Sequence, residues 1–203
     1  MQAVARVLTT DLFDLKVFGL KYIPAHGGAL IVSNHQSNLD PVLLGARLRR
    51  PMSYMAKSEL FAVNPVLTEL FRLLGGFPVH QGAADVRAVK ESIERLKEGH
   101  LLSIFPEGGR TMDGEIAKME KGVALIVRRA GVPVIPAVIV GAYEAWPWNR
   151  TVPRRLPIRV QFGPAMELAD KKPTEILETI ARTLRSMFDE LRNRRRRADG
   201  KEK

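Results

Sequence analysis

Short apolar runs alternate along the chain with stretches in which apolar residues return every three or four positions. Runs of this length are typical of buried strands, and they cover 29–33, 52–56, 77–79, 101–105, 132–140 and 158–162. The stretches between them predict helices at about 41–48, 64–74, 85–98 and 121–130. This alternation predicts an α/β fold, in which helices flank a mostly parallel central sheet. No internal repeat interrupts the pattern, so we expect a single domain over 1–203 with its α/β core at 30–165.

The C-terminal part, 173–203, combines an amphipathic stretch with a basic tail. Its apolar spacing predicts a long helix from Pro173 to about Arg194 that packs one face on the core. That face consists of Ile176, Ile180, Leu184, Met187, Phe188 and Leu191. For the tail RNRRRRADGKEK two interpretations stay open: a solvated, frayed end, or contact with an anionic surface, worth ~1 kcal/mol per basic residue at a membrane.

The N-terminal segment, 1–25, carries a second helical stripe. Its apolar residues are Val4, Leu8, Leu12 and Leu15, with Phe13 and Phe18 nearby. Such a stripe either covers the sheet or lies in a lipid interface. Because Arg6, Lys16 and Lys21 flank it, we favour the interface. Asp11 and Asp14 interrupt the stretch, which falls short of the ~18 apolar residues needed to span a bilayer.

Composition narrows the chemistry and the partners. The chain has 203 residues and no cysteine, so a thiol nucleophile, a thiolate metal site and disulfides are excluded. Lys and Arg number 32 against 22 Asp and Glu, which gives a formal net charge of +10. A charge of this sign favours anionic partners: phosphate esters, nucleic acid or lipid headgroups.

The candidate chemistry begins at IVSNHQSNLDP, residues 31–41, where a predicted strand runs into small polar residues. His35 and Asp40 lie five positions apart, and a turn brings such residues together where a regular helix would separate them by about 140°. The carboxylate would then hold one imidazole nitrogen and leave the other as a general base for a hydroxyl. Asp40, directly before Pro41, is also a typical helix N-cap. For His35 the alternative is a turn histidine without a chemical role.

A second polar cluster, FPEGGRTMDG, follows the strand predicted at 101–105. Ligands of open α/β sheets bind beyond the carboxyl ends of the strands, so the two clusters converge on one crevice if their strands are parallel neighbours. Gly108 and Gly109 let the backbone approach a ligand closely, and Glu107 lies beside them. The guanidinium of Arg110 suits phosphate or carboxylate. The alternative is a Gly-Gly turn with a solvated arginine.

Phosphate-loop, nucleophile-elbow and H-E-x-x-H motifs are absent from the sequence. Nucleotide hydrolysis, a serine hydrolase and a zinc protease therefore lack support. A histidine base with an anion-binding arginine remains.

The motifs NHQSNLD and FPEGGR, followed by VPVIPAVI, resemble three sequence blocks of the glycerolipid acyltransferases, the 1-acylglycerol-3-phosphate acyltransferase family. These blocks are H-x₄-D, F-P-E-G-x-R and V-P-V-I-P, and the resemblance spans about 30 to 140. It implies that a fatty acyl group passes from acyl-CoA or acyl-carrier protein to the free hydroxyl of a lysophospholipid. It also implies that neither a cofactor nor a metal takes part.

The resemblance assigns roles to the two clusters. His35 would deprotonate the hydroxyl, and Asp40 would orient His35 and balance its charge. The family's acceptor-binding block matches Glu107, Gly108 and Arg110, with Arg110 as the residue for the phosphate, and Gly109 within the block is a further candidate binding residue. Many members carry threonine where this chain has Gly109.

The segment GGFPVHQG departs from the family pattern, which usually has an arginine where this chain has His80 and Gln81. Gln81 is neutral, so Arg87, Lys118 or Lys121 would have to supply the charge. If none does, the acceptor is not lysophosphatidate, since a lost charged contact is worth ~1.5 to 3 kcal/mol.

Three functions stay open. The first is an acyltransferase that makes phosphatidic acid, bound peripherally to an anionic membrane surface on the cytoplasmic face. The second keeps the reaction but takes another lysolipid or a lipid-linked sugar. The third is a nucleic-acid binder, suggested by the +10 charge and RNRRRR. Without a base-reading basic helix or an aromatic platform, we do not expect nucleic acid as a partner.

Trp146 and Trp148 lie either at a headgroup boundary or in the core.

Overall fold

The computed structural model describes residues 13–61, 68–69, 72, 75–79, 86–198 and 200. Its strands are β1 (Lys16–Phe18), β2 (Ala29–Ser33), β3 (Met52–Lys57), β4 (Gly76–Val79), β5 (Leu101–Ile104), β6 (Val134–Val140) and β7 (Arg159–Phe162). Its α-helices are α2 (Asp40–Gly45), α4 (Val86–Lys97), α5 (Gly122–Ala130), α6 (Ala142–Ala145) and α7 (Pro173–Ala198). Two short 3-10 helices are η1 (Leu20–Tyr22) and η2 (Ser58–Phe61).

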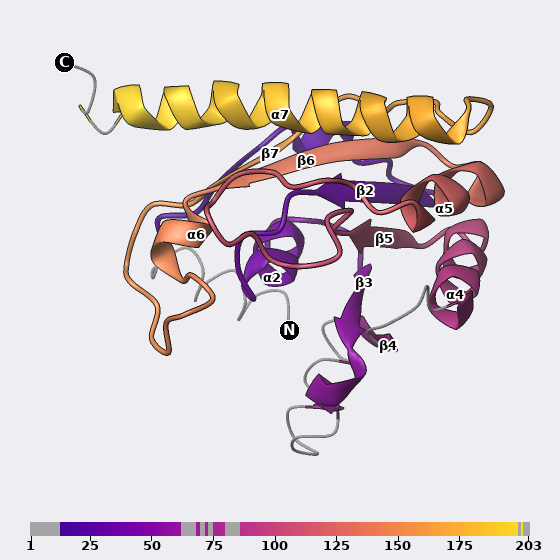
Figure 1. Cartoon of the computed structure of the whole chain (residues 1–203), viewed down its shortest axis with the longest axis horizontal. Helices are drawn as coiled ribbons and strands as arrows, with labels where there is room; N and C mark the ends of the chain where they lie inside the picture. The colour runs from indigo at the N-terminus through magenta and orange to yellow at the C-terminus, as the bar shows by residue number, and fades with distance from the viewer. Residues whose placement is uncertain are drawn as a thin grey trace.

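The strands form one seven-stranded sheet in the order β1-β7-β6-β2-β5-β3-β4 (Figure 1). Strands β6, β2, β5, β3 and β4 run parallel to one another. Strand β7 runs antiparallel to β6, and β1 runs parallel to β7. The predicted α/β fold with a mostly parallel sheet is confirmed.

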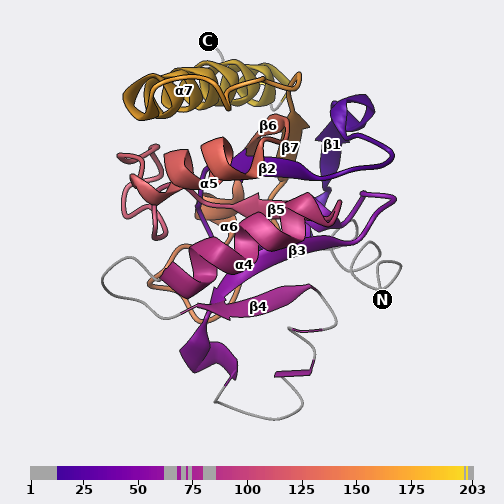
Figure 2. The same ribbon diagram turned by 90° about the vertical axis from the view of Figure 1, so that its right-hand side faces the viewer.

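Helices cover both faces of the sheet. Successive residues of a strand point to opposite faces, and β2 shows this: Leu30 and Val32 pack under α4, α5 and α7, whereas Ala29 and Ile31 pack under α2 and α6. Figure 2 shows α4, α5 and α7 side by side across one face. Every residue of β2 is buried, as expected for a central parallel strand with helices on both faces. The loops beyond the strand ends are therefore where polar chemistry is accessible.

Helix α7 extends further than the sequence predicts. All six residues of its predicted apolar face are buried, but the helix continues to Ala198 instead of ending at about Arg194. Arg192 lies 2.6 Å from the carboxylate of Glu115, and Arg195 lies 3.3 Å from that of Glu144. The expectation of a frayed tail is wrong for these residues because their side chains pair with neighbouring segments.

The described part of the N-terminal segment covers the sheet. Phe13 and Leu15 are buried, and Lys16–Phe18 pair with β7 as a strand. The helix predicted there is therefore wrong for residues 14–18, and the lipid interface is wrong for the buried side chains of Phe13 and Leu15. The buried guanidinium of Arg159 on β7 explains the attachment, because it donates a 2.9 Å hydrogen bond to the carboxylate of Asp14. The rest of the predicted stripe, Val4, Leu8 and Leu12 with Arg6, lies outside the described residues.

The other helix predictions vary in outcome. Those at 85–98 and 121–130 are confirmed as α4 and α5, and the one at 41–48 corresponds to the shorter α2. The one at 64–74, like His80 and Gln81, lies mostly outside the described residues. Within the described ranges, no helix combines the length and apolarity needed to cross a membrane.

Candidate active site

The carboxyl ends of β2 and β5 lie side by side. The strands are parallel neighbours with Val32 opposite Ile104, so the loops that follow them leave the same edge of the sheet. These are the β2–α2 loop (34–39) and the β5–α5 loop (105–121). They are joined directly, because the backbone N–H of Thr111 donates to the carbonyl oxygen of His35 with N···O 2.8 Å. The convergence of the two polar clusters is confirmed.

His35 and Asp40 form a hydrogen-bonded pair. Nδ1 of His35 lies 2.8 Å from Oδ2 of Asp40, whose side chain is fully buried, while that of His35 is 18% exposed. The same carboxylate oxygen accepts from the backbone N–H groups of Gln36 and Ser37 at 2.6 and 2.8 Å. An ionised carboxylate only accepts, so Nδ1 donates the proton of this pair and Nε2 keeps a lone pair.

The N-cap role expected for Asp40 is wrong. Helix α2 begins at Asp40, Leu39 occupies the N-cap position, and no side-chain cap forms. The carboxylate turns back to N–H groups that precede it in the chain, at Gln36 and Ser37, and Pro41 after it has no N–H to offer. Asp40 therefore organises the β2–α2 loop around His35.

The imidazole of His35 is held on one face and open at one nitrogen. The ring of Phe105 stacks on it with centroids 4.0 Å apart and planes inclined by 17°. Among the described residues, Nε2 has no hydrogen-bond partner. This arrangement is suited to a general base, because the tautomer is set from one side and the basic nitrogen stays available.

Both carboxylate oxygens of Glu107 accept hydrogen bonds from backbone N–H groups. Oε1 accepts from His35 at 2.8 Å, and Oε2 accepts from Ala117 at 2.7 Å. Burial raises the pKa of the Glu107 carboxyl above its ordinary value, and the hydrogen bonds from Ala117 and His35 oppose the rise. Glu107 thus links the backbone of His35 to the backbone of Ala117, which lies ten residues further along the β5–α5 loop.

The next residues of the β5–α5 loop differ in what surrounds them. Gly108 has φ +72°, in the left-handed region, and a Cβ there would lie 3.0 Å from the side chain of Glu120. Around Gly109 nothing lies within 4 Å of a Cβ. Arg110 is half-buried, and within the described ranges its guanidinium has no acidic partner. This part of the loop combines open space with an uncompensated positive charge.

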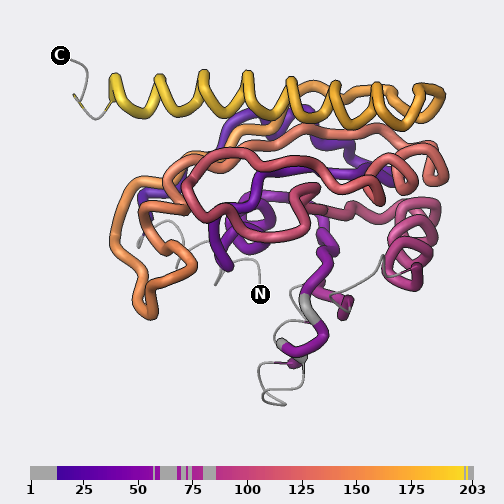
Figure 3. The backbone as a smooth tube through the Cα atoms, viewed as in Figure 1, coloured from indigo at the N-terminus to yellow at the C-terminus, as the bar shows by residue number. Residues whose placement is uncertain are grey.

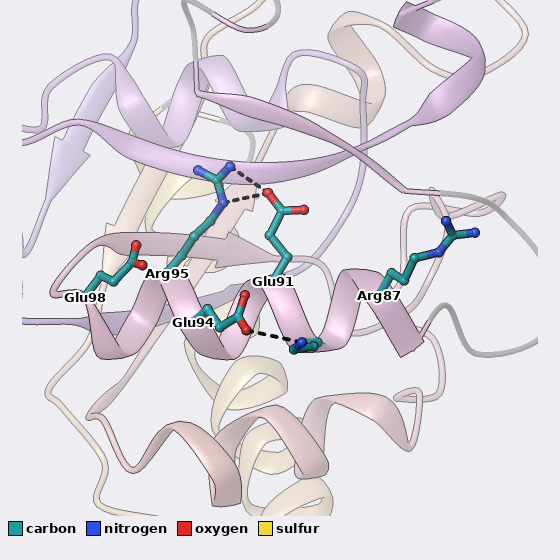
Figure 4. A pocket seen from close by; sticks show the side chains of 6 residues that line it. Arg87, Glu91, Glu94, Arg95 and Glu98 are labelled. Atoms are coloured by element: carbon teal, nitrogen blue, oxygen red, sulfur yellow. Dashed lines mark hydrogen bonds and ion pairs between the residues drawn. The ribbon is translucent and has the colours of Figure 1, made fainter.

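Of the three basic residues expected to replace a missing arginine, Lys118 and Lys121 lie on the β5–α5 loop and Arg87 lies on α4. Lys118 is exposed on the β5–α5 loop, one residue beyond the contact between Ala117 and Glu107. Arg87 lies in a surface groove along α4, lined also by Lys90, Glu91, Glu94, Arg95 and Glu98 (Figure 4). None of these residues belongs to the loops after β2 and β5, so the structure groups Lys118, and not Arg87, with the His35 loop.

Two residues beside His35 hold the site from positions that motif reasoning missed. The Asn34 side chain makes paired hydrogen bonds with the backbone of Ile139 on β6. Nε2 of Gln36 donates to the carbonyl of Gly114 at 3.1 Å, and its Oε1 accepts from the N–H of Tyr143 at 3.3 Å. The sequence shows an amide side chain on each side of His35, but it does not show their partners, which are distant along the chain. In the described part of the chain, no group of three or more His, Asp and Glu side chains is arranged to hold a metal ion.

The comparisons with known proteins agree on one family. A family model described as acyltransferase matches residues 14–140. A 1-acyl-sn-glycerol-3-phosphate acyltransferase of Bacillus subtilis is 28% identical over 184 residues, which is 89% of each chain. A chloroplastic 1-acyl-sn-glycerol-3-phosphate acyltransferase of Arabidopsis thaliana is 29% identical over 146 residues, 70% of this chain. The match spans only 40% of that Arabidopsis relative.

A solved structure shares the fold. The crystal structure of the 1-acyl-sn-glycerophosphate acyltransferase PlsC from Thermotoga maritima aligns with a TM-score of 0.80 at 27% identity. The alignment covers 94% of this chain and 78% of the Thermotoga chain. The described fold, with both polar loops at one sheet edge, is therefore similar to that of a lysophosphatidate acyltransferase.

Proposed function

This chain belongs to the acyltransferase family, and from that premise we propose that it acylates the sn-2 hydroxyl of 1-acylglycerol-3-phosphate and so makes phosphatidic acid. The acyl donor in this proposal is a thioester, either acyl-CoA or acyl-carrier protein. The names of the Bacillus and Arabidopsis relatives support the acceptor. The +10 charge of the chain suits both anionic donors.

One observation carries the proposal: the 2.8 Å hydrogen bond from the N–H of Thr111 to the carbonyl oxygen of His35. It fixes Arg110, the residue before Thr111, to the loop that carries the base. An acceptor whose phosphate binds the guanidinium of Arg110 would then present its hydroxyl near Nε2 of His35. Positioning of this kind contributes more to rate than the binding of either group alone.

The proposed step begins with proton transfer from the acceptor hydroxyl to Nε2 of His35. Asp40 accepts from Nδ1, so it stabilises the imidazolium that forms. The alkoxide oxygen forms a bond to the thioester carbonyl carbon, and the carbon–sulfur bond breaks. The proton on Nε2 then passes to the departing thiolate, which leaves the base ready for another cycle.

The acceptor phosphate is assigned to the 108–110 segment. Arg110 offers a planar set of donors for a phosphate, and the open space at Gly109 lets the phosphate approach the backbone. Lys118 on the same loop adds positive charge. Glu107 contributes by holding this loop against His35.

A peripheral position on the cytoplasmic face of a membrane is part of the proposal. The acceptor is a membrane lipid, and the chain carries a strong positive charge. Basic residues near an anionic leaflet are attracted to its headgroups.

The test is release of the free thiol from acyl-CoA or acyl-carrier protein in the presence of lysophosphatidate. We expect the wild-type protein to turn over and His35→Ala to lose a factor of about 10² to 10⁴ in kcat, the usual contribution of a general base. His100→Ala is the matched control. His100 is exposed, its ring lies 3.9 Å from the carboxylate of Glu98, and it precedes the amino end of β5, whereas His35 follows the carboxyl end of β2. Undiminished turnover by His35→Ala would refute the proposed role of His35.

A second acceptor is favoured by one sequence feature, the neutral Gln81 where the family usually has arginine. The candidates are another lysolipid and a lipid-linked sugar. A panel of acceptors measured at equal concentration decides between them. Lysophosphatidate with the highest kcat/KM supports the first proposal, and a different acceptor with a higher value supports the second.

A further inference from the structure

The segment between α6 and β7, 146–158, exposes apolar and basic side chains together. Trp148 is 48% exposed and Val152 is 68% exposed, and Arg150, Arg154 and Arg155 are exposed around them. Exposure of Trp148 and Val152 to water is unfavourable. The headgroup boundary of a bilayer accommodates apolar and basic side chains together, and an indole suits it because it is apolar with one hydrogen-bond donor. We propose that this segment docks the protein onto an anionic lipid surface. The proposal rests on the proposed function, because the acceptor is itself a lipid.

The three arginines of the segment carry positive charge that no ion pair within the described ranges compensates. Among the described residues, none of the three arginines has an acidic partner. The acid nearest in sequence on α6, Glu144, pairs with Arg195 of α7. The guanidinium groups are therefore available to anionic headgroups, whose attraction extends over about one Debye length, ~10 Å at moderate salt.

Backbone contacts at its base preorganise the segment. The indole N–H of Trp146 donates to the carbonyl of Arg150 at 2.8 Å, and the N–H of Arg150 donates to the carbonyl of Pro147 at 3.2 Å. The N–H of Arg154 donates to the carbonyl of Ala145 at 2.7 Å. Of the two tryptophans, Trp146 is thus used to build the turn. Trp148 is presented outward by it, so the headgroup interpretation applies to Trp148.

The segment lies at the edge of the sheet that carries His35. Helix α6, where it starts, follows β6, and β6 is the neighbour of β2. Tyr143 on α6 donates its N–H to the side chain of Gln36, the residue after His35. Figure 3 shows the segment at the end of the molecule where α7 also ends. A bilayer bound here would face the proposed site for the lipid acceptor.

A nucleic acid would match the charge but not the apolar groups. Nucleic-acid phosphates bind arginine but do not bury an exposed valine, whereas a membrane–water interface accommodates both side chains. Lipid is therefore the occupant that accounts for all five side chains. Binding to vesicles and to duplex DNA separates the two occupants experimentally.

The test measures binding of the purified full chain to vesicles of phosphatidylcholine with and without phosphatidylglycerol, by cosedimentation. The first variant is Arg154→Gln with Arg155→Gln, and its control is Arg128→Gln with Arg129→Gln. The control pair is also exposed and adjacent, and removes the same charge, but lies at the C-terminal end of α5. We expect the loop pair to raise the apparent Kd for anionic vesicles about thirtyfold, at roughly a factor of five per arginine, and the control pair to leave it within about twofold.

The second variant tests the apolar contact. Trp148→Ser is compared with Leu125→Ser, because Leu125 on α5 has the same 48% exposure. We expect Trp148→Ser to weaken vesicle binding and to abolish the blue shift of tryptophan emission on vesicle binding, since only Trp146 remains. Leu125→Ser should bind vesicles as the wild type does.

Three results would overturn the proposal: loop variants that bind vesicles as well as the wild type, a control pair that weakens binding as much as the loop pair, or duplex DNA that competes vesicles off through the same arginines. The chemistry is separated by His35→Ala, which should bind vesicles unchanged. A wild-type protein that binds vesicles but transfers no acyl group would refute the proposed function while supporting the docking surface.

Discussion

The side chain of Asn34 takes the place of a neighbouring strand residue opposite Ile139. Its Nδ2 donates to the carbonyl of Ile139 at 2.9 Å, and its Oδ1 accepts from the N–H of Ile139 at 2.8 Å. The amide is buried, so both bonds form away from water. The last residue before His35 is thereby tied to β6, and the base is anchored to the rigid centre of the sheet.

Asn34→Asp should destabilise the protein and lower its activity. The carboxylate keeps the size of the amide but cannot donate to the carbonyl of Ile139, and two acceptors then face each other in a buried position. We expect a loss of about 1 to 3 kcal/mol in the free energy of unfolding, measured by urea denaturation. Asn38→Asp, at an exposed position of the same loop, is the control, and an equal loss in both variants would contradict the anchoring role.

Asp40→Asn should leave the fold largely intact and lower kcat. Only Oδ2 of Asp40 accepts hydrogen bonds, and among the described residues Oδ1 has no partner, so an amide NH₂ takes the unbonded position. What disappears is the negative charge that stabilises the imidazolium of His35. We expect kcat to fall by about 10² to 10⁴, measured by thiol release.

The control for Asp40→Asn is Asp113→Asn. Asp113 also accepts from a backbone N–H, that of Glu115, and from the hydroxyl of Thr111, but it is exposed. We expect its kcat to stay within about threefold of wild type, since it does not contact the imidazole. An Asp40→Asn protein with wild-type kcat would show that His35 works without its charged partner.

Local sequence signals predicted the position of the site. The apolar runs before His35 and Glu107 predicted β2 and β5, and the rule that ligands bind beyond strand carboxyl ends placed both loops at one edge. That reasoning needs only neighbouring residues and the parallel order of the strands.

The sequence did not predict the internal contacts of the site because their partners are far apart along the chain. Asn34 and Ile139 are separated by 105 positions, and Glu107 bonds to the backbone of His35 over 72 positions. The pattern D-P is typical of an N-cap, but the carboxylate of Asp40 instead accepts from two N–H groups and the imidazole of the preceding loop. Strand β1 is only three residues long, too short to leave a periodic signal.

Glu107→Gln should show a stability difference from wild type that depends on pH. Burial raises the pKa of Glu107 above its ordinary value of 4.5, so the folded protein binds this proton more tightly than the unfolded chain does. The stabilisation from protonated Glu107 is therefore fully present below pH 4.5 and is lost as pH rises through the raised pKa. Glutamine does not titrate.

We accordingly expect the wild-type advantage in Tm over Glu107→Gln to grow as pH falls from neutrality toward 4.5, measured by thermal unfolding. Glu120→Gln is the control, since Glu120 is exposed on the same loop. A difference in Tm that shrinks on acidification would mean that the hydrogen bonds, which lower the pKa of Glu107, outweigh burial, which raises it.

Arg110→Gln should raise KM for lysophosphatidate and change kcat much less. Arg110 has no acidic partner within the described ranges, so its loss breaks no ion pair of the protein and mainly removes the proposed phosphate contact. A charged hydrogen bond is worth about 1.5 to 3 kcal/mol, which corresponds to a rise in KM of about 10- to 150-fold.

Two variants serve as controls. Arg129→Gln removes one charge from the C-terminal end of α5 and so separates this effect from that of net charge. Arg110→Lys should restore part of the affinity, because lysine keeps the charge but not the planar guanidinium. If Arg110→Gln lowers kcat with KM unchanged, the guanidinium acts on the reacting groups and the phosphate must be bound elsewhere, with Lys118 the next residue to replace.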